Sequence, residues 1–141
     1  RLVQGDYDGD AKTDLAVYRD GTWFVANSSN NSISIQNWGN ATDKPVSGDF
    51  DGDGRNDLAI YRNGAWWIVY SLSNTTGVIS FGLATDIPAP ADFDGDGSTD
   101  IVVYRGSTGE WFVLKSSNMT ITGVKWGTTG DVAVPSAYIP Q

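Results

Sequence analysis

The chain has 141 residues, a formal net charge of −8, and neither cysteine nor histidine. This length allows one domain or three small repeat units, and the 40% hydrophobic content supports a packed core. The composition excludes a disulfide framework, and the absence of a basic stripe weighs against nucleic acid as a partner. Without His or Cys the usual nucleophile–base pairs are missing, which predicts a protein that is not an enzyme.

Two features bear on the cellular location. No apolar run approaches the roughly eighteen residues of a membrane span, so no membrane insertion is expected. No signal peptide precedes Arg1, which predicts a mature or trimmed chain.

Internal repeats organise the chain. Each unit contains an acidic nine-residue turn, a β-branched run ending in Tyr-Arg, a run that opens with Trp, and a segment that ends in Trp-Gly or Phe-Gly. The predicted units span residues 1–43, 44–86 and 87–131, and residues 132–141 are expected to form the first strand of an incomplete fourth unit. In that fourth copy Ala137 stands where the first Asp of the turn should be.

Each unit is expected to contain four short strands. Asp20-Gly21, Asn63-Gly64 and the segment 106–109 are hairpin turn signals between the second and third strands. Pro45, Pro88 and Pro135 stand near the start of a first strand, where a missing N–H costs the ladder least. The sequence therefore predicts an all-β fold of tandem four-stranded antiparallel blades of β-propeller type, three repeats plus one strand of a fourth.

The acidic turns have the composition of calcium sites, because calcium takes six to eight oxygen ligands. In the second turn the predicted ligands are the side chains of Asp49, Asp51 and Asp53, the backbone carbonyl of Arg55, and Asp57. The corresponding predicted ligands of the first and third turns are Asp6, Asp8, Asp10, Lys12 (carbonyl) and Asp14, and Asp92, Asp94, Asp96, Ser98 (carbonyl) and Asp100. Three calcium ions are expected, one per repeat.

Other interpretations of the turns were weighed. The twelfth position of the second turn is Ile60 rather than Glu, so the turn is not an EF-hand. Asp-Gly turns without metal are the simplest alternative, but unneutralised carboxylates would repel one another in all three copies. Magnesium prefers octahedral geometry and retained waters. The first turn has Ala11 where the others have Gly54 and Gly97, so its site is expected to be the weakest.

The pattern Asp-x-Asp-Gly-Asp-Gly-x-x-Asp between two strands, preceded by Trp/Phe-Gly and a Pro, resembles the FG-GAP/VCBS repeats. The resemblance implies calcium-binding propeller blades like those of integrin α-chains, and it covers essentially the whole chain. The functions of that family are diverse, so the resemblance by itself implies no particular function.

A closed propeller generally has at least four blades, and three repeats plus one strand fall short of this number. The chain is then part of a longer protein, one member of a ring completed by several chains, or an open array. Unpaired strand edges invite further copies or adjacent blades to add on. The expected edges are Leu2–Gly5 and Ala133–Tyr138.

The recurring Tyr-Arg and Trp positions allow two interpretations. Aromatic side chains can stack on sugars, which would make carbohydrate a partner. Alternatively they pack between neighbouring blades, with each Arg paired to an acid such as Asp43, Asp86 or Asp131; recurrence in every unit favours this packing.

Five Asn residues stand in N-x-Ser/Thr sequons, the acceptor sequence for N-glycosylation. Turns favour Asn and Ser in any case, so ordinary turn chemistry is the alternative. The predicted glycosylation positions are Asn30, Asn74 and Asn118, at the turn between the third and fourth strands, and Asn27 and Asn40.

Together these patterns predict a non-enzymatic extracellular or cell-surface protein, stabilised by calcium, with a structural or adhesive role and end-to-end assembly into a larger propeller or filament. The alternatives are a lectin-like propeller and an accessory domain of a larger secreted enzyme.

Overall fold

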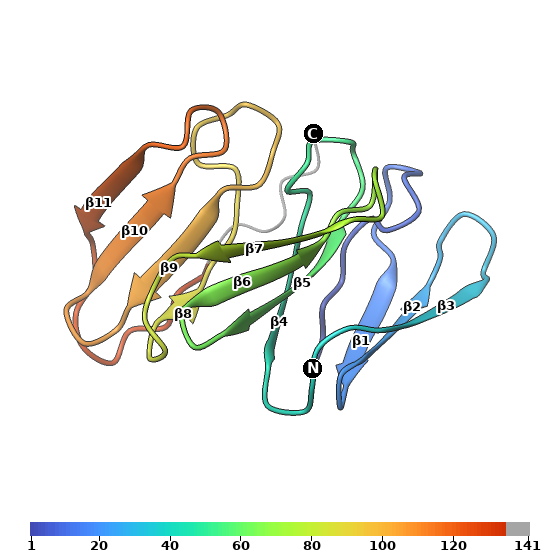
Figure 1. Cartoon of the computed structure of the whole chain (residues 1–141), viewed down its shortest axis with the longest axis horizontal. Coiled ribbons are helices and arrows are strands. Elements are labelled where there is room, and N and C mark those ends of the chain that lie inside the picture. Colours follow the sequence, from blue (N-terminus) through green and yellow to red (C-terminus); the bar gives the residue numbers. More distant parts are fainter. Residues whose placement is uncertain (135–141) are drawn as a thin grey trace.

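A computed structural model of the chain describes residues 1–134, and these residues form three antiparallel sheets without a helix (Figure 1). The sheets lie one after another along the chain. The first contains β1 (Leu15–Arg19), β2 (Thr22–Ala26) and β3 (Ile33–Asn37). The second contains β4 (Lys44–Gly48), β5 (Asp57–Arg62), β6 (Ala65–Val69) and β7 (Thr76–Ser80). The third contains β8 (Ile87–Pro88), β9 (Ile101–Arg105), β10 (Glu110–Leu114) and β11 (Ile121–Lys125).

The second sheet shows how local sequence sets the strand register. Asn63 and Gly64 both have positive φ, at 51° and 83°, which is the backbone of a two-residue type I′ hairpin. This turn pairs Arg62 with Ala65 and continues the ladder to Leu58 opposite Val69. Asp20 and Gly21 form the same turn in the first sheet, so the predicted hairpins are confirmed there.

The all-β class and the tandem antiparallel sheets are confirmed, with one difference in strand count. Only the second sheet has a first strand of full length. In the first sheet this strand is reduced to isolated bridges between Leu2 and Val17 and between Gly5 and Asp14, and β8 has only two residues. The described residues form no closed propeller. The predicted strand of a fourth unit lies mostly outside the described residues, and 132–134 have no regular structure.

The hydrophobic core lies between neighbouring sheets. Trp23 and Trp66 are completely buried, and each donates its indole N–H to a backbone carbonyl of its own unit. Ile60 of the second sheet packs into the cluster around Trp23, and Val103 of the third packs into the cluster around Trp66. The recurring aromatic positions therefore hold adjacent sheets together, as the packing interpretation predicts.

A buried ion pair joins each sheet to the next. Arg62 donates from Nε and Nη2 to Asp43 at 2.7 and 2.6 Å, and Arg105 binds Asp86 in the same way at 3.0 and 2.8 Å. Burial raises the pKa of the Asp43 carboxyl, but the hydrogen bonds from Arg62 and from the Asn40 N–H outweigh it, so this pKa lies below its ordinary value. The ion pair is thus part of the packing between sheets.

The described residues contain no helix with the length and apolarity that a membrane crossing requires.

The substitution Asp43→Asn should lower the free energy of unfolding by about 2 kcal/mol, because it removes the charge that Arg62 faces. This is less than for a fully buried pair, since the Arg62 side chain is 36% exposed. Chemical denaturation measures the change. Asp20→Asn, the same substitution in an exposed turn, is the control, and equal stability of the two variants would contradict the prediction.

Candidate metal centres

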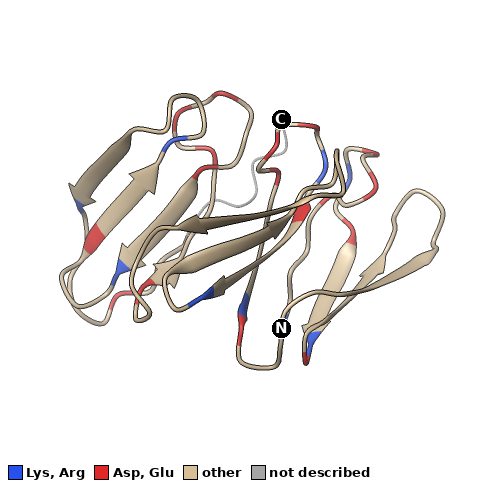
Figure 2. Cartoon of the chain, viewed as in Figure 1, with Lys and Arg blue, Asp and Glu red and all other residues tan. Residues whose placement is uncertain are grey.

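Each unit carries its acidic turn at the same end of its sheet. The turns connect the first strand or its bridged equivalent to β1, to β5 and to β9. Figure 2 shows the acidic residues gathered in these loops, along the upper side of the view. The three turns therefore form a row across neighbouring sheets.

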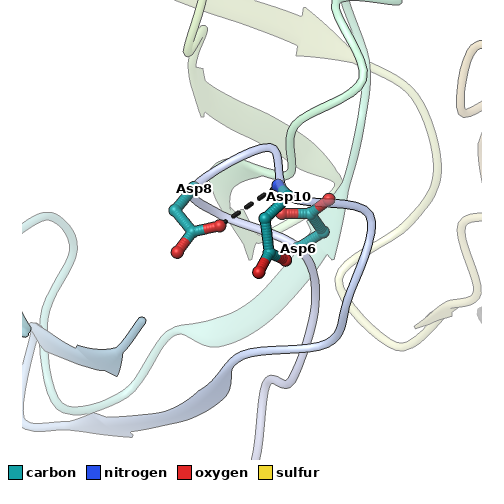
Figure 3. Close-up of side chains that lie close together, drawn as sticks. All are labelled: Asp6, Asp8 and Asp10. Carbon is teal, nitrogen blue, oxygen red and sulfur yellow. Dashed lines mark hydrogen bonds between the residues drawn. The ribbon is translucent and has the colours of Figure 1, made fainter. Parts of the chain in front are cut away.

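The first three aspartates of each turn lie together. In every unit they can offer one carboxylate oxygen each, and these oxygens lie within 4.8 Å of one another. Figure 3 shows the three side chains of the first turn grouped inside one loop. The three groups are Asp6, Asp8 and Asp10; Asp49, Asp51 and Asp53; and Asp92, Asp94 and Asp96.

The backbone of the turn holds these carboxylates in place. Asp49 accepts the N–H groups of Gly52 at 2.6 Å and Gly54 at 2.8 Å, so its side chain closes the turn. Asp53 accepts the N–H of Arg55 at 2.8 Å. Burial raises the pKa of the Asp49 carboxyl despite these hydrogen bonds. The turn thus gathers negative charge at a place where charge is unfavourable without a counter-ion.

The fourth aspartate of each turn is buried and has a different set of contacts. The two carboxylate oxygens of Asp57 accept the N–H of Phe50 and the N–H of Ser71, both at 2.7 Å. Burial, together with the charge of Asp51, raises the pKa of Asp57 to about 6 although these hydrogen bonds oppose it. Asp14 and Asp100 make equivalent contacts. These residues join the acidic turn to the turn that follows the third strand; their predicted role as metal ligands stays a prediction.

Serines in the turn after the third strand also contact the triad. These contacts were not predicted from the sequence. Ser71 donates its hydroxyl to Asp53 at 2.9 Å. Ser116 and Ser117 donate theirs to Asp96 and Asp94 at 2.8 and 2.6 Å. The available signal was the recurrence of Ser two positions after the end of the third strand in every unit. These hydroxyls close one side of the carboxylate cluster.

The donor set fits a hard divalent cation. It consists of oxygen atoms only, which suits calcium. Asp51 Oδ1 is buried and has no hydrogen-bond partner among the described residues, so one ligand position of the second turn is left unsatisfied by the protein. A divalent ion there would satisfy this oxygen and offset the repulsion between carboxylates. Calcium as the ion, and the carbonyls of Lys12, Arg55 and Ser98 as ligands, stay predictions.

The first turn differs from the others in its backbone. Ala11 has a φ of 63°, in the left-handed region, where Gly54 and Gly97 stand in the other two turns. A residue with a Cβ is disfavoured in this conformation. This strain is the physical basis for expecting the first site to be the weakest.

Neighbouring acidic turns are bonded to each other. The carbonyl of Asp6 accepts the N–H of Asn56, and the carbonyl of Asp49 accepts the N–H of Thr99 at 2.6 Å. Gly48 permits this approach, because a Cβ there would lie 2.7 Å from Thr99 Cγ2. The first aspartate of one site is therefore held by the next unit.

The predicted glycosylation positions fall on turns and vary in exposure. Asn30, Asn74, Asn118 and Asn40 are exposed. Asn27 is half-buried, and its side-chain amide donates to Ser32 and Ser34. The three sequons in the turns after the third strand do not occupy equivalent positions. Asn74 has a positive φ, as do Asn31 and Met119, which stand one position after the sequon residues Asn30 and Asn118.

Stacked antiparallel sheets, each with an aspartate triad in the turn between two strands, define a tandem β-repeat protein with candidate metal sites. Residues 49–103, from the second acidic turn to β9, match the FG-GAP-like repeat family. Repeats of this family are typically not catalytic. No curated protein matches the chain, and no solved structure matches it.

The substitution Asp51→Asn should weaken calcium binding at the second site by about tenfold or more, because it replaces a charged oxygen ligand by a neutral one. Isothermal titration calorimetry should then show one site with a large loss of affinity and smaller changes at the two others. Asp20→Asn again serves as the matched control. A titration identical to that of the unsubstituted protein would contradict the assignment of this turn.

Proposed function

We propose that the protein is a non-enzymatic extracellular repeat protein whose sheets are stabilised by calcium and whose role is structural or adhesive. The observation that carries this proposal is that hydrogen bonds tie each acidic turn to other parts of the fold. Through Asp57 and Ser71 the second triad contacts the next hairpin, and through the Asp49 carbonyl it contacts the third unit. A cation bound there stabilises architecture.

The other interpretations have less support. A lectin-like site on the recurring aromatic positions of the first two units would lack accessible rings, because Trp23, Trp66 and Tyr61 are at most 2% exposed. The chain contains neither His nor Cys, so the usual nucleophile–base pairs of enzymes are missing. An accessory domain of a larger secreted enzyme would show the same calcium dependence, with the chemistry located elsewhere.

An extracellular location agrees with the chemistry of the sites. Exposed loops of this kind bind calcium with dissociation constants of about 10⁻⁴ M in extracellular modules, where calcium is about 1 mM. Each occupied site would then contribute roughly 1.4 kcal/mol, and three sites about 4 kcal/mol. Three divalent ions would also reduce the formal net charge from −8 to about −2.

Removal of calcium should therefore lower the melting temperature by about 10–15 °C. Differential scanning calorimetry in 1 mM calcium and in excess EGTA measures the shift, and an equal concentration of magnesium is the control for ionic strength and charge. A melting curve that is the same in calcium and in EGTA would contradict the proposed role of the metal.

Glycosylation supplies a separate test of the location. In protein from its native source, mass spectrometry of proteolytic peptides should find glycan on exposed Asn30, Asn74 or Asn118. Asn27 should be unmodified, since its amide nitrogen is engaged in hydrogen bonds. Unmodified peptides at all three of these exposed positions would contradict this prediction.

A further inference from the structure

The same set of contacts joins the first sheet to the second and the second to the third. An Asp near the end of one unit binds the Arg at the end of the second strand of the next unit. The carbonyl of the first loop aspartate accepts an N–H from the eighth loop position of the next unit. At the first junction Trp38 also donates its indole N–H to the carbonyl of Trp67 at 3.2 Å. These contacts make a directional interface that repeats along the chain.

Each half of this interface also occurs once more in the chain, at its two ends, without a partner among the described residues. Arg19 occupies the position of Arg62 and Arg105, and it contacts the Phe24 ring but no carboxylate of residues 1–134. Asp131 occupies the position of Asp43 and Asp86. Its carboxylate accepts the N–H of Thr128, as the Asp43 carboxylate accepts that of Asn40, but no Lys or Arg of the described residues lies against it.

The outer face of the first sheet is apolar where its equivalents are buried. Leu15 and Val17 are 76% and 36% exposed, whereas Ile60 and Val103, which match Val17, are 2% and 0% exposed. Together with Leu2, these side chains line a shallow hollow of about 710 Å³ that also reaches Arg19. We call this surface, made of Leu2, Leu15, Val17, Arg19 and Phe24, the head face.

The third unit presents the complementary surface. Trp126 is 79% exposed, whereas Trp38 at the same position is half-buried against the second sheet. Phe93 is 49% exposed, and Trp111 is half-buried where Trp23 and Trp66 are completely buried. We call this surface, made of Phe93, Trp111, Trp126 and Asp131, the tail face.

We propose that the tail face of one copy of this chain docks on the head face of a second copy, in the register that joins consecutive units within the chain. Asp131 then binds Arg19 of the second copy through two hydrogen bonds. The Trp126 indole donates to the Phe24 carbonyl, and the Asp92 carbonyl accepts the Thr13 N–H. This inference rests on the proposed structural role and specifies the interface that serves it.

Three observations favour a second copy as the occupant. The two faces carry opposite charges, on Arg19 and Asp131. Both faces expose apolar side chains whose equivalents are buried at the two internal junctions. Each face also occupies the same positions as a surface that binds the other kind at an internal junction, with Arg19 in place of Arg62 and Asp131 in place of Asp43. Because the contact uses different surfaces on the two copies, it generates a ring or an open filament.

Charge reversal at each face provides the test. In 1 mM calcium the unsubstituted chain should form oligomers whose mass rises with protein concentration in sedimentation-velocity experiments. Arg19→Glu and Asp131→Arg should each remain monomeric at concentrations at which the unsubstituted chain associates. A mixture of the two variants should associate again, because one has an intact tail face and the other an intact head face.

Ser80→Glu is the control, since it adds negative charge at an exposed position of β7, in the second sheet and outside both faces, and it should associate like the unsubstituted chain. A chain that stays monomeric at all concentrations would overturn the inference, as would an Arg19→Glu variant that associates like the control. Failure of the mixture to associate would also overturn it.

The melting shift with calcium separates this inference from the proposed function. Arg19→Glu should keep the full shift, because Arg19 contacts no acidic turn. A monomeric unsubstituted chain that keeps the shift would overturn the interface alone. Loss of the shift in the unsubstituted chain would overturn the calcium-dependent role itself.

Discussion

The structure depends on the buried aspartate that ends each acidic turn. Asp14, Asp57 and Asp100 are at most 1% exposed, and each uses its carboxylate to accept backbone N–H groups from two separate turns. A buried carboxylate is unfavourable unless it is hydrogen-bonded, so these contacts are obligatory once the hairpin forms. They bring the turn after the third strand, with its serines, against the aspartate triad. The candidate metal site therefore arises from the same contact that closes each unit.

The second constraint is that one unit cannot bury its own aromatic face. Trp23 and Trp66 become completely buried only because hydrophobic side chains of the following sheet cover them. The ion pair between Asp43 and Arg62 fixes the orientation of this contact, since a planar guanidinium binds a carboxylate best through two hydrogen bonds. Packing and charge together give the junction a direction. The same logic makes the head face and the tail face complementary surfaces.

Metal binding at the triads would be coupled to the packing of sheets in this arrangement. The carbonyl of Asp49 is bonded to Thr99, so the second triad and the third unit share a backbone contact. Ordering of one acidic turn by an ion would favour the position of the next turn. A row of occupied sites would therefore stiffen the array of sheets.

Much of this protein could be read from its sequence by itself. The spacing of the acidic turns, the Asn63-Gly64 hairpin and the Tyr-Arg and Trp positions predicted the sheets, their hairpins and the grouped aspartates, because these features depend on neighbours within a few residues. The Arg–Asp pairs were also expected as an alternative to sugar binding. Other features required the tertiary structure: the serine hydroxyls against the triads, the bonds between successive turns, and the unpartnered state of Arg19 and Asp131 within the described residues. These depend on segments about 14 to more than 40 positions apart, and only the packing of sheet on sheet decides which of them meet.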